Sequence, residues 1–415
     1  GVTAGAETRD RIKTDEGSAS RISRNGLARA GRDGLYLLVV LAAVVWVYIW
    51  VRSAIRDDAI GFDFEGTLWN AGAAILDGRS PYPEPIRAEV DSGNPALYPP
   101  LLMVLVAPLT ALPWWVGVTA WTGLLAGALT LTLYVLDVRD ARCYALALIS
   151  APVAGGLVFG NATLLLAPMV ALAWRWKDHW LRSGLLIGAA IASKLFVWPL
   201  LFWLLGTRRY RAFGAAIVST VIGILAPWAA IGFDGLTTYP DLLRVASEIY
   251  GVHSYSATAM LSAVGVGAEL AGRGAFVVGF AVAALALIAG RRGTDDVSIS
   301  LAVLAAILGS PIVWEHNFAL LLIPLAIARP RFSGLWLVLP LLYLTHRLPR
   351  PHLSASALEP GGAACCRPAD VPQSVWVFSH APPGLWPAAG HAVLAVVLVA
   401  FVAWSTLRAS ERTLR

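Results

Sequence analysis

Apolar runs of about 15 to 23 residues recur along this chain, and they constrain its fold more than any other feature. An α-helix needs roughly 20 apolar residues to cross the hydrocarbon core of a bilayer. The chain is 57% hydrophobic and only 14% charged, whereas a soluble domain carries about 25% charged residues. The pattern therefore predicts an all-α polytopic membrane protein with about 10–13 transmembrane or re-entrant helices.

The first span is predicted at residues 35–51, and a basic segment precedes it. Positively charged flanks stay on the cytoplasmic side, so residues 1–33 are expected to form a disordered cytoplasmic tail. The loop after the first span should then face away from the cytoplasm. No cleavable signal peptide is expected, because the first apolar run is itself long enough to span a membrane.

That first extracytoplasmic loop, residues 52–98, is long, polar and acidic. Its acidic residues outnumber its four arginines two to one: Asp57, Asp58, Asp63, Glu65, Asp77, Glu84, Glu89 and Asp91. Loops of this length that are not linkers usually carry function. Apolar side chains near helical spacing over residues 67–76 predict a short amphipathic helix at the membrane surface.

The middle of the chain contains broken apolar runs. An apolar run opens at Tyr98 and reaches residue 112, a full span is predicted at 114–136, and two short runs meet at Gly160 and Asn161. The run 184–205 contains Lys194 and has basic flanks on both sides. A single crossing would put one basic cluster outside, whereas a re-entrant hairpin of two half-helices keeps both inside, and the hairpin is favoured. The basic clusters between residues 99 and 182 conflict, so one assignment there is expected to be wrong.

The last third of the chain mixes spans with loops. A second outward loop is predicted at 232–255, a non-spanning element at 257–271 and a span at 275–290. Residues 34–345 are expected to form one membrane domain. A loosely ordered Pro- and Ala-rich loop should follow at 346–384, then a C-terminal transmembrane helix at 385–407 and a cytoplasmic tail at 408–415.

Two charged residues lie where charge needs an explanation. Asp63 precedes the predicted amphipathic helix and could act as a general base toward a hydroxyl group, although an N-cap role is the plain alternative. Lys194 lies inside an apolar run, where a cation should face the bundle interior and could bind a phosphate-bearing lipid. Its plain alternative is snorkelling to the membrane surface.

A third candidate is His316 with its neighbour Glu315, at the end of a span. Histidine can donate to a phosphate or sugar oxygen, although a satisfied interfacial histidine is an equal alternative. Asn161 is a weaker candidate, at a tight turn. Its Asn-Ala-Thr sequence matches a glycosylation sequon, but the short flanking spans make it a poor acceptor.

Several function classes find no support in the sequence. It has no P-loop, no G-x-G-x-x-G after a strand, no H-E-x-x-H and no G-x-S-x-G. The net charge of +6 sits in short clusters beside apolar runs, which orients helices and does not indicate nucleic-acid binding. The three cysteines have no zinc spacing.

A first span followed by five motifs in a fixed order carries a resemblance to a known family. After the first span come D-F-x-x-x-x-x-x-A-G-A-A-I-L-D-G-R-S-P-Y, Y-P-P, G-N-A-T-L-L-L, S-K-x-x-x-x-P and S-P-I-V-W-E-H-N-F-A-L-L-L-I-P-L. Over residues 35–345 this order resembles the bacterial polyprenyl-phosphate-mannose-dependent α-1,2-mannosyltransferases, glycosyltransferase family 87. The resemblance implies the GT-C membrane fold.

The resemblance also implies roles for particular residues. Asp63 would be the general base of an inverting transfer, and Lys194 and His316 would bind the donor phosphate. Tyr98, Asn161 and Glu315 would line the substrate cavity. The family usually has Gln where Asn161 stands and often Tyr where Asn317 stands, which bears on the acceptor more than on the reaction.

The expected substrates are a polyprenyl-phosphate sugar donor, with mannose as the sugar, and a glycolipid or cell-envelope glycan acceptor. No cofactor or divalent metal is indicated, and nucleic acid is not an expected partner. The expected location is the bacterial plasma membrane, with the active site on the extracytoplasmic side.

Two alternatives remain open at this stage. A multispan transporter or flippase would also hold charge within the membrane, but transporters usually contain internal repeats, and no second copy of the acidic loop is found. A non-catalytic scaffold of envelope assembly is the other, and the presence of Asp63, Lys194 and His316 argues against it.

Overall fold

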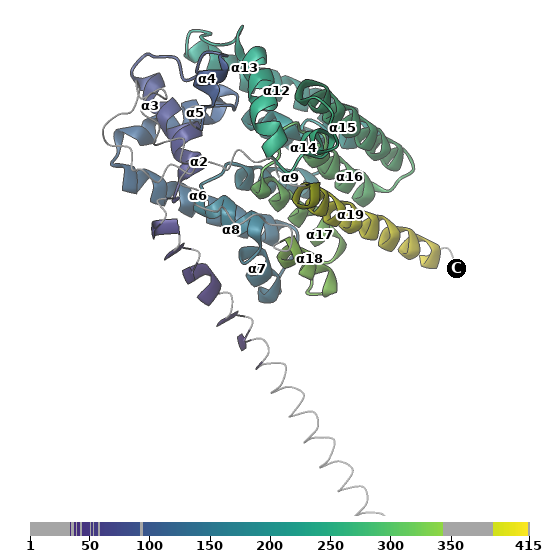
Figure 1. The fold of residues 1–415 in the computed structure, drawn as a ribbon. Coiled ribbons are helices and arrows are strands. Elements are labelled where there is room, and N and C mark those ends of the chain that lie inside the picture. Colours follow the sequence, from purple (N-terminus) through teal and green to yellow (C-terminus); the bar gives the residue numbers. More distant parts are fainter. Residues whose placement is uncertain are drawn as a thin grey trace, which may run out of the picture.

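The computed structural model describes residues 59–91, 94–342 and 385–413, together with most residues between 34 and 56. Every regular element in this part of the chain is a helix, which confirms the all-α prediction (Figure 1). The described residues of the predicted first span are helical. The predicted tail 1–33 and the Pro- and Ala-rich loop lie outside the described residues. The last helix runs past the predicted boundary at residue 407 to Thr413.

The helices have the following bounds. The first half contains α2 (Phe62–Phe64), η1 (Glu65–Trp69), α3 (Asn70–Leu76), α4 (Arg87–Val90), α5 (Pro100–Val106), η2 (Ala107–Ala111), α6 (Trp114–Val135), α7 (Ala141–Leu148), α8 (Ala151–Val158), α9 (Thr163–Arg175), α10 (Trp180–Ser193) and η3 (Leu195–Val197). The second half contains α11 (Leu200–Gly206), α12 (Tyr210–Ala230), α13 (Tyr239–Tyr250), η4 (Gly251–His253), α14 (Ala257–Ala263), α15 (Ala268–Arg291), α16 (Asp295–Leu308), η5 (Glu315–Leu321), α17 (Leu322–Ala328), η6 (Gly334–Leu337), α18 (Val338–Leu341) and α19 (Leu385–Thr413).

Three described helices are long and apolar enough to cross a membrane, namely α6, α12 and α15. The bent pair α7 and α8, with a 65° angle between them, would make a fourth if it is one span, and several shorter apolar helices of 10–17 residues surround these. The chain is thus a polytopic helical membrane protein. The predicted span 114–136 is confirmed in α6, whereas α15 begins at Ala268, earlier than predicted, and leaves only α14 as a short element before it.

The predicted amphipathic helix of the first loop begins earlier than expected. Helical residues run without a break from Phe62 through α2, η1 and α3, and the N-cap is Gly61 with φ 75° and no side-chain cap. Asp63 therefore lies inside the first turn, and the N-cap interpretation of its side chain is wrong. Carbonyl groups from a distant part of the chain accept the hydrogen bonds that a capping side chain would otherwise accept. The N–H groups of Gly61 and Asp63 each donate a 2.8 Å hydrogen bond to the final carbonyls of the α8 segment, those of Val158 and Phe159.

The segment 184–205 is a helical hairpin, as favoured from its basic flanks. The chain breaks at Lys194, whose backbone is extended (φ −156°, ψ 109°). Both ends of the hairpin meet one carboxylate. Asp295 lies 2.9 Å from Lys177 Nζ before α10 and 2.8 Å from Arg209 Nη1 after α11. The two basic flanks are therefore at the same end of the bundle.

The apolar segment Pro100–Ala111 lies at the loop end of the bundle. Tyr98 precedes it and contacts Asn161, while Ala107 near its end packs against α3, where a Cβ on Gly72 would lie 3.0 Å from Ala107 Cα. Because both ends of this segment meet the same part of the molecule, it does not cross the bundle. This removes one crossing and accounts for the conflict between the basic clusters of residues 99–182.

Three turns between helices meet beneath the first loop. The turn from α8 to α9 carries Asn161, the turn from α10 to η3 carries Lys194, and the turn from α16 to η5 leads into His316 and Asn317. Hydrogen bonds connect the three turns directly (below). In Figure 1 the loop helices α3 and α4 gather with α5 and α13 at the upper side, and α7 and α18 lie at the lower side. The predicted second outward loop is thus largely the helix α13, which packs on the first loop through Tyr239 and Tyr250.

Candidate active site

The carboxylate of Asp63 faces the turn at Gly160 and Asn161. Asn161 Nδ2 donates a 2.7 Å hydrogen bond to Asp63 Oδ2, and Asn94 Nδ2 lies 3.3 Å from Oδ1. His316 Nδ1 is 3.6 Å from Oδ2, beyond direct hydrogen-bond length but within electrostatic range. The Asp63 side chain is 17% exposed. One oxygen is thus held firmly and the other loosely.

Burial raises the pKa of the Asp63 carboxyl above its ordinary value, because the charged form loses water. Hydrogen bonding from Asn161, the charge of Lys194 and the bond from Asn94 oppose this effect and favour the charged form. A carboxylate with a raised pKa is a stronger base than a solvated aspartate. The surroundings of Asp63 therefore suit proton abstraction.

The ammonium group of Lys194 is held inside the bundle by oxygen atoms from the other two turns. Its Nζ is 2.9 Å from Thr163 Oγ1, 3.4 Å from Asn161 Oδ1 and 3.5 Å from Asn317 Oδ1. It also lies 5.0 Å from the centre of the Tyr98 ring. The snorkelling interpretation is therefore wrong, since the cation points toward Asp63 and its partners and not toward a membrane surface.

Asn161 connects the base to the cation. Its Oδ1 accepts from the backbone N–H of Thr163 at 2.9 Å and from Thr163 Oγ1 at 2.8 Å, which fixes the amide with Nδ2 toward Asp63. The preceding Gly160 has φ 71°, and its carbonyl accepts a 2.7 Å bond from the indole N–H of Trp121. Asn161 is 2% exposed, so the folded structure leaves no room for a glycan on its side chain.

His316 is 5% exposed, and its Nε2 has no hydrogen-bond partner among the described residues. Buried polar atoms are nearly always paired, so an orphaned ring nitrogen beside the Asp63 carboxylate marks a place where a ligand could bind. The interpretation of His316 as a satisfied interfacial histidine does not fit this arrangement. The imidazole lies with Nδ1 toward the Asp63 carboxylate.

Tyr98 and Glu315 are placed differently from each other. The Tyr98 hydroxyl accepts from Asn161 Nδ2 at 3.3 Å, and burial, aided by the Asp63 charge, raises its pKa so that it stays neutral. The Glu315 carboxylate faces α19 instead, with Oε1 3.7 Å from His391 Nε2. Five of the six predicted residues thus share one cluster, and Glu315 adjoins it with its carboxylate turned toward α19.

Four residues of this region were missed as site residues: Asn94, Thr163, Asn317 and His391. Thr163 and Asn317 stand inside two of the motifs, next to residues that were predicted, and that proximity was the available signal. His391 is a lone histidine in an apolar run and is fully buried in the structure. Asn94 gave no signal, because an asparagine in a loop is ordinary. Within the described ranges no three His, Cys, Asp or Glu side chains lie close enough together to hold a metal ion.

Comparison with known proteins gives the cluster a context. The model of glycosyltransferase family 87 matches residues 96–313, more than half of the chain. A polyprenol-phosphate-mannose-dependent alpha-(1-2)-phosphatidylinositol pentamannoside mannosyltransferase from Mycolicibacterium smegmatis is 27% identical over 383 residues, 86% of this chain and 86% of its own. A protein of the same description from Mycobacterium tuberculosis is 25% identical over 432 residues, 96% of this chain and 92% of its own. No solved structure matches the chain significantly.

Proposed function

The chain belongs to glycosyltransferase family 87, and on that premise we propose that it transfers mannose from a polyprenyl-phosphate donor to a hydroxyl group of a glycolipid. The two curated relatives name the polyprenol-phosphate-mannose donor and a phosphatidylinositol mannoside acceptor. An acceptor of that chemical class, a mannosylated lipid, is proposed here as well. The observation that carries the proposal is the partly buried Asp63 carboxylate, 2.7 Å from Asn161 and within 4 Å of His316.

The proposed reaction is a single displacement with inversion. The acceptor oxygen forms a bond to the anomeric carbon while the bond from that carbon to the phosphate oxygen breaks. The hydroxyl proton passes to Asp63, and the electron pair of the broken bond leaves with polyprenyl phosphate. General-base assistance of this kind typically accelerates a reaction about 10²–10⁴-fold.

Lys194 and His316 are proposed to bind the leaving phosphate. Its negative charge increases as the sugar–phosphate bond breaks, and preorganised hydrogen-bond donors and charges stabilise that charge most in a site without bulk water. Among the described residues, the atoms within hydrogen-bond distance of Lys194 Nζ are neutral oxygens of Thr163, Asn161 and Asn317, while the Asp63 carboxylate acts on it from farther away. His316 Nε2 has no hydrogen-bond partner among the described residues, and in the tautomer that carries the ring proton on Nε2 it would donate to a phosphate oxygen.

The protein resides in a membrane, and we place its active site on the extracytoplasmic side of the bacterial plasma membrane. The arrangement of basic residues supports this. The Lys177 and Arg209 flanks meet at Asp295, whereas Asp63 is linked through Asn161 to Lys194 at the hairpin turn. Basic flanks mark the cytoplasmic side. The 14-residue helix α10 spans about 21 Å between the two levels.

A direct experiment tests the proposal. Membranes containing the protein would be incubated with radiolabelled polyprenyl-phosphate mannose and mannosylated glycolipid acceptors, and labelled product would be separated from donor. We expect transfer by the wild type and a loss of about 10²–10⁴-fold in Asp63→Asn. The matched control is Asp77→Asn, the same change on a carboxylate of the same loop that is 60% exposed, and it should keep full activity.

Two outcomes would contradict the proposal. Full activity of Asp63→Asn would remove this residue from the mechanism. Movement of labelled lipid across the membrane without a new glycosidic bond would favour the transporter alternative over the transferase.

A further inference from the structure

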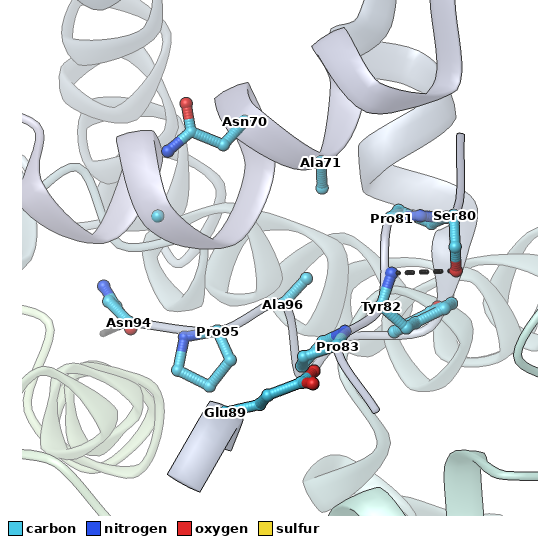
Figure 2. Close-up of a pocket in the computed structure, with 11 residues that line it drawn as sticks. Asn70, Ala71, Ser80, Pro81, Tyr82, Pro83, Glu89, Asn94, Pro95 and Ala96 are labelled. Carbon is cyan, nitrogen blue, oxygen red and sulfur yellow. Dashed lines mark hydrogen bonds between the residues drawn. The ribbon is translucent and has the colours of Figure 1, made fainter. Parts of the chain in front are cut away.

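A cleft in the first loop adjoins the catalytic candidate Asp63. It has a volume of about 320 Å³, at the lower end of the range of roughly 300–1,000 Å³ typical of small-molecule sites. Figure 2 shows Asn70 and Ala71 of the loop helix on one side and the segment with Asn94 and Pro95 on the other. Asn94 belongs to both places, since it lines the cleft and its Nδ2 lies 3.3 Å from Asp63 Oδ1.

The lining of the cleft fits a sugar and does not fit a phosphate or an acyl chain. Its polar side chains include Asn70, Glu89 and Asn94, and proline rings with Tyr82 supply small apolar faces. Planar amides and carboxylates can each bind two hydroxyl groups, and apolar faces suit the C–H side of a sugar ring. Of the described residues that line the cleft, none is Lys, Arg or His. An anionic donor phosphate therefore finds no counter-charge here, in contrast to the Lys194 side of Asp63.

The two oxygens of Asp63 face these two sides. Oδ2 accepts the short bond from Asn161 and lies nearest His316, on the side proposed for the donor. Within the described part of the chain, Oδ1 receives the long contact from Asn94, whose Nδ2 is shared with the carbonyl of Phe62, also at 3.3 Å. A long, shared hydrogen bond is weak and easily exchanged. Oδ1 is thus the oxygen that an incoming hydroxyl group could reach.

The position of Asn94 is built into the fold. A Cβ on Gly66 would lie 2.5 Å from the carbonyl oxygen of Asn94 and 2.7 Å from its Cβ, so only glycine in η1 lets this segment approach. The segment is also held from behind, because the Tyr239 hydroxyl of α13 donates a 2.9 Å bond to the carbonyl of Leu97. The contact between Asn94 and Asp63 therefore follows from two separate packing constraints.

From this geometry we infer that the cleft binds the hydroxyl-rich glycan headgroup of the acceptor and that Asn94 guides the acceptor hydroxyl to Asp63 Oδ1. The inference rests on the proposed transferase function and adds the site of the second substrate. Asn70 and Glu89 recognise sugar hydroxyls, and the lipid part of the acceptor stays outside the cleft.

The first test uses purified enzyme in lipid nanodiscs with saturating polyprenyl-phosphate mannose and a varied mannosylated glycolipid. Asn70→Trp places an indole over the cleft from an exposed helix position. We expect it to raise the acceptor KM at least ten-fold with the donor KM unchanged. Asp77→Trp, an equally exposed change near the end of the same helix but outside the cleft, is the control and should leave both constants unchanged.

Asn94→Ala tests whether Asn94 guides the acceptor hydroxyl or only orients the Asp63 carboxylate. We expect it to raise the acceptor KM and to lower kcat, with the donor KM unchanged. A fall in kcat with an unchanged acceptor KM would mean that Asn94 only orients the base. An unchanged acceptor KM in Asn70→Trp, or an equal rise in its donor KM, would overturn the assignment of the cleft.

A binding measurement distinguishes failure of this inference from failure of the proposed function. Saturation-transfer NMR with methyl α-mannoside, without donor, should report binding to the wild type and to Asp77→Trp and not to Asn70→Trp. A wild type that transfers no mannose but still binds this probe in the cleft would contradict the transferase and leave the sugar site standing. Transfer by the wild type with equal probe binding in all three proteins would overturn the cleft alone.

Discussion

The side-chain amide of Asn161 donates a 2.7 Å hydrogen bond to the carboxylate of Asp63, 98 residues earlier in the chain. This contact joins the first loop to the turn between α8 and α9, and through Thr163 it extends to the ammonium of Lys194. The base and the cation of the proposed reaction are therefore held by one continuous network. A substitution in this network should therefore change the pKa of Asp63 or the use of the donor in a direction that the contacts predict.

The pH dependence of transfer should report the state of Asp63. Because burial raises its pKa, the carboxylate forms at a higher pH than an ordinary aspartate, and kcat/KM should rise with pH through that pKa. Asn161→Ala removes a donor that favours the charged form, so the acid limb should move to still higher pH. The pH–rate profiles of both proteins check this. Asp77→Asn should leave the limb in place, and a limb that moves to lower pH in Asn161→Ala would contradict the assignment.

Replacing Lys194 should weaken use of the donor. Lys194→Met removes the cation proposed to face the leaving phosphate, and we expect kcat/KM for the donor to fall about 10²–10³-fold. Thr163→Val keeps the cation but removes its 2.9 Å partner, which should cost about 1 kcal/mol, or roughly five-fold. Steady-state kinetics with varied donor measures both. Arg139→Met, an exposed change elsewhere, serves as the control, and equal effects of Thr163→Val and Lys194→Met would argue against a direct role of the charge.

Much of this arrangement was predictable from the sequence because charge in an apolar setting is costly. Asp63 and Lys194 stood out for that reason, and the two basic flanks of Lys194 led to the hairpin that Asp295 closes. The start of the loop helix at Phe62 was not predictable. Its first N–H groups are satisfied by Val158 and Phe159, and no local pattern reveals a partner so far along the chain.

The uncharged polar residues of the site were also not predictable from the sequence. Asn94 and Thr163 are common residue types in loops and at helix starts, so their contacts with Asp63 and Lys194 appear only in three dimensions. Glu315 shows the opposite case. Its position next to His316 made it a reasonable cavity residue. Neighbouring residues of a helix point in different directions, however, and the Glu315 carboxylate faces His391.

The ion-pair cluster at Asp295 should stabilise the hairpin. Asp295→Ala leaves Lys177 and Arg209 without their shared partner, and these side chains are only 19–29% exposed. We expect a loss of about 1–3 kcal/mol, between the values for exposed and buried pairs. Thermal unfolding in detergent checks the loss. Asp77→Ala breaks the exposed pair with Arg79 at a position with ordinary backbone angles and should change little, so equal melting temperatures of the two variants would contradict the stabilising role.

Gly160→Ala should undock the first loop. At φ 71° an alanine is strained by roughly 1–2 kcal/mol, and its Cβ would lie 2.8 Å from the Cβ of Phe64. A shift of about 1 Å in Asp63 can lower kcat about 100-fold. Gly123→Ala in α6 meets no atom within 4 Å and should keep wild-type kcat with a slight gain in stability. Kinetics and thermal unfolding of both variants provide the test, and normal turnover by Gly160→Ala would show that the turn tolerates a side chain.

The hydrogen bonds from Gly61 and Asp63 to the end of α8 have a consequence for fidelity. A base beside an activated sugar ester can activate water as well as the acceptor, and the donor would then be hydrolysed. A loop that swings away from α8 would strand two backbone donors and carry Asp63 from Asn161 in the same step. Asp63 therefore keeps its contact with Asn161 only while the loop is docked on α8, and a displaced loop would leave the proposed donor without its base.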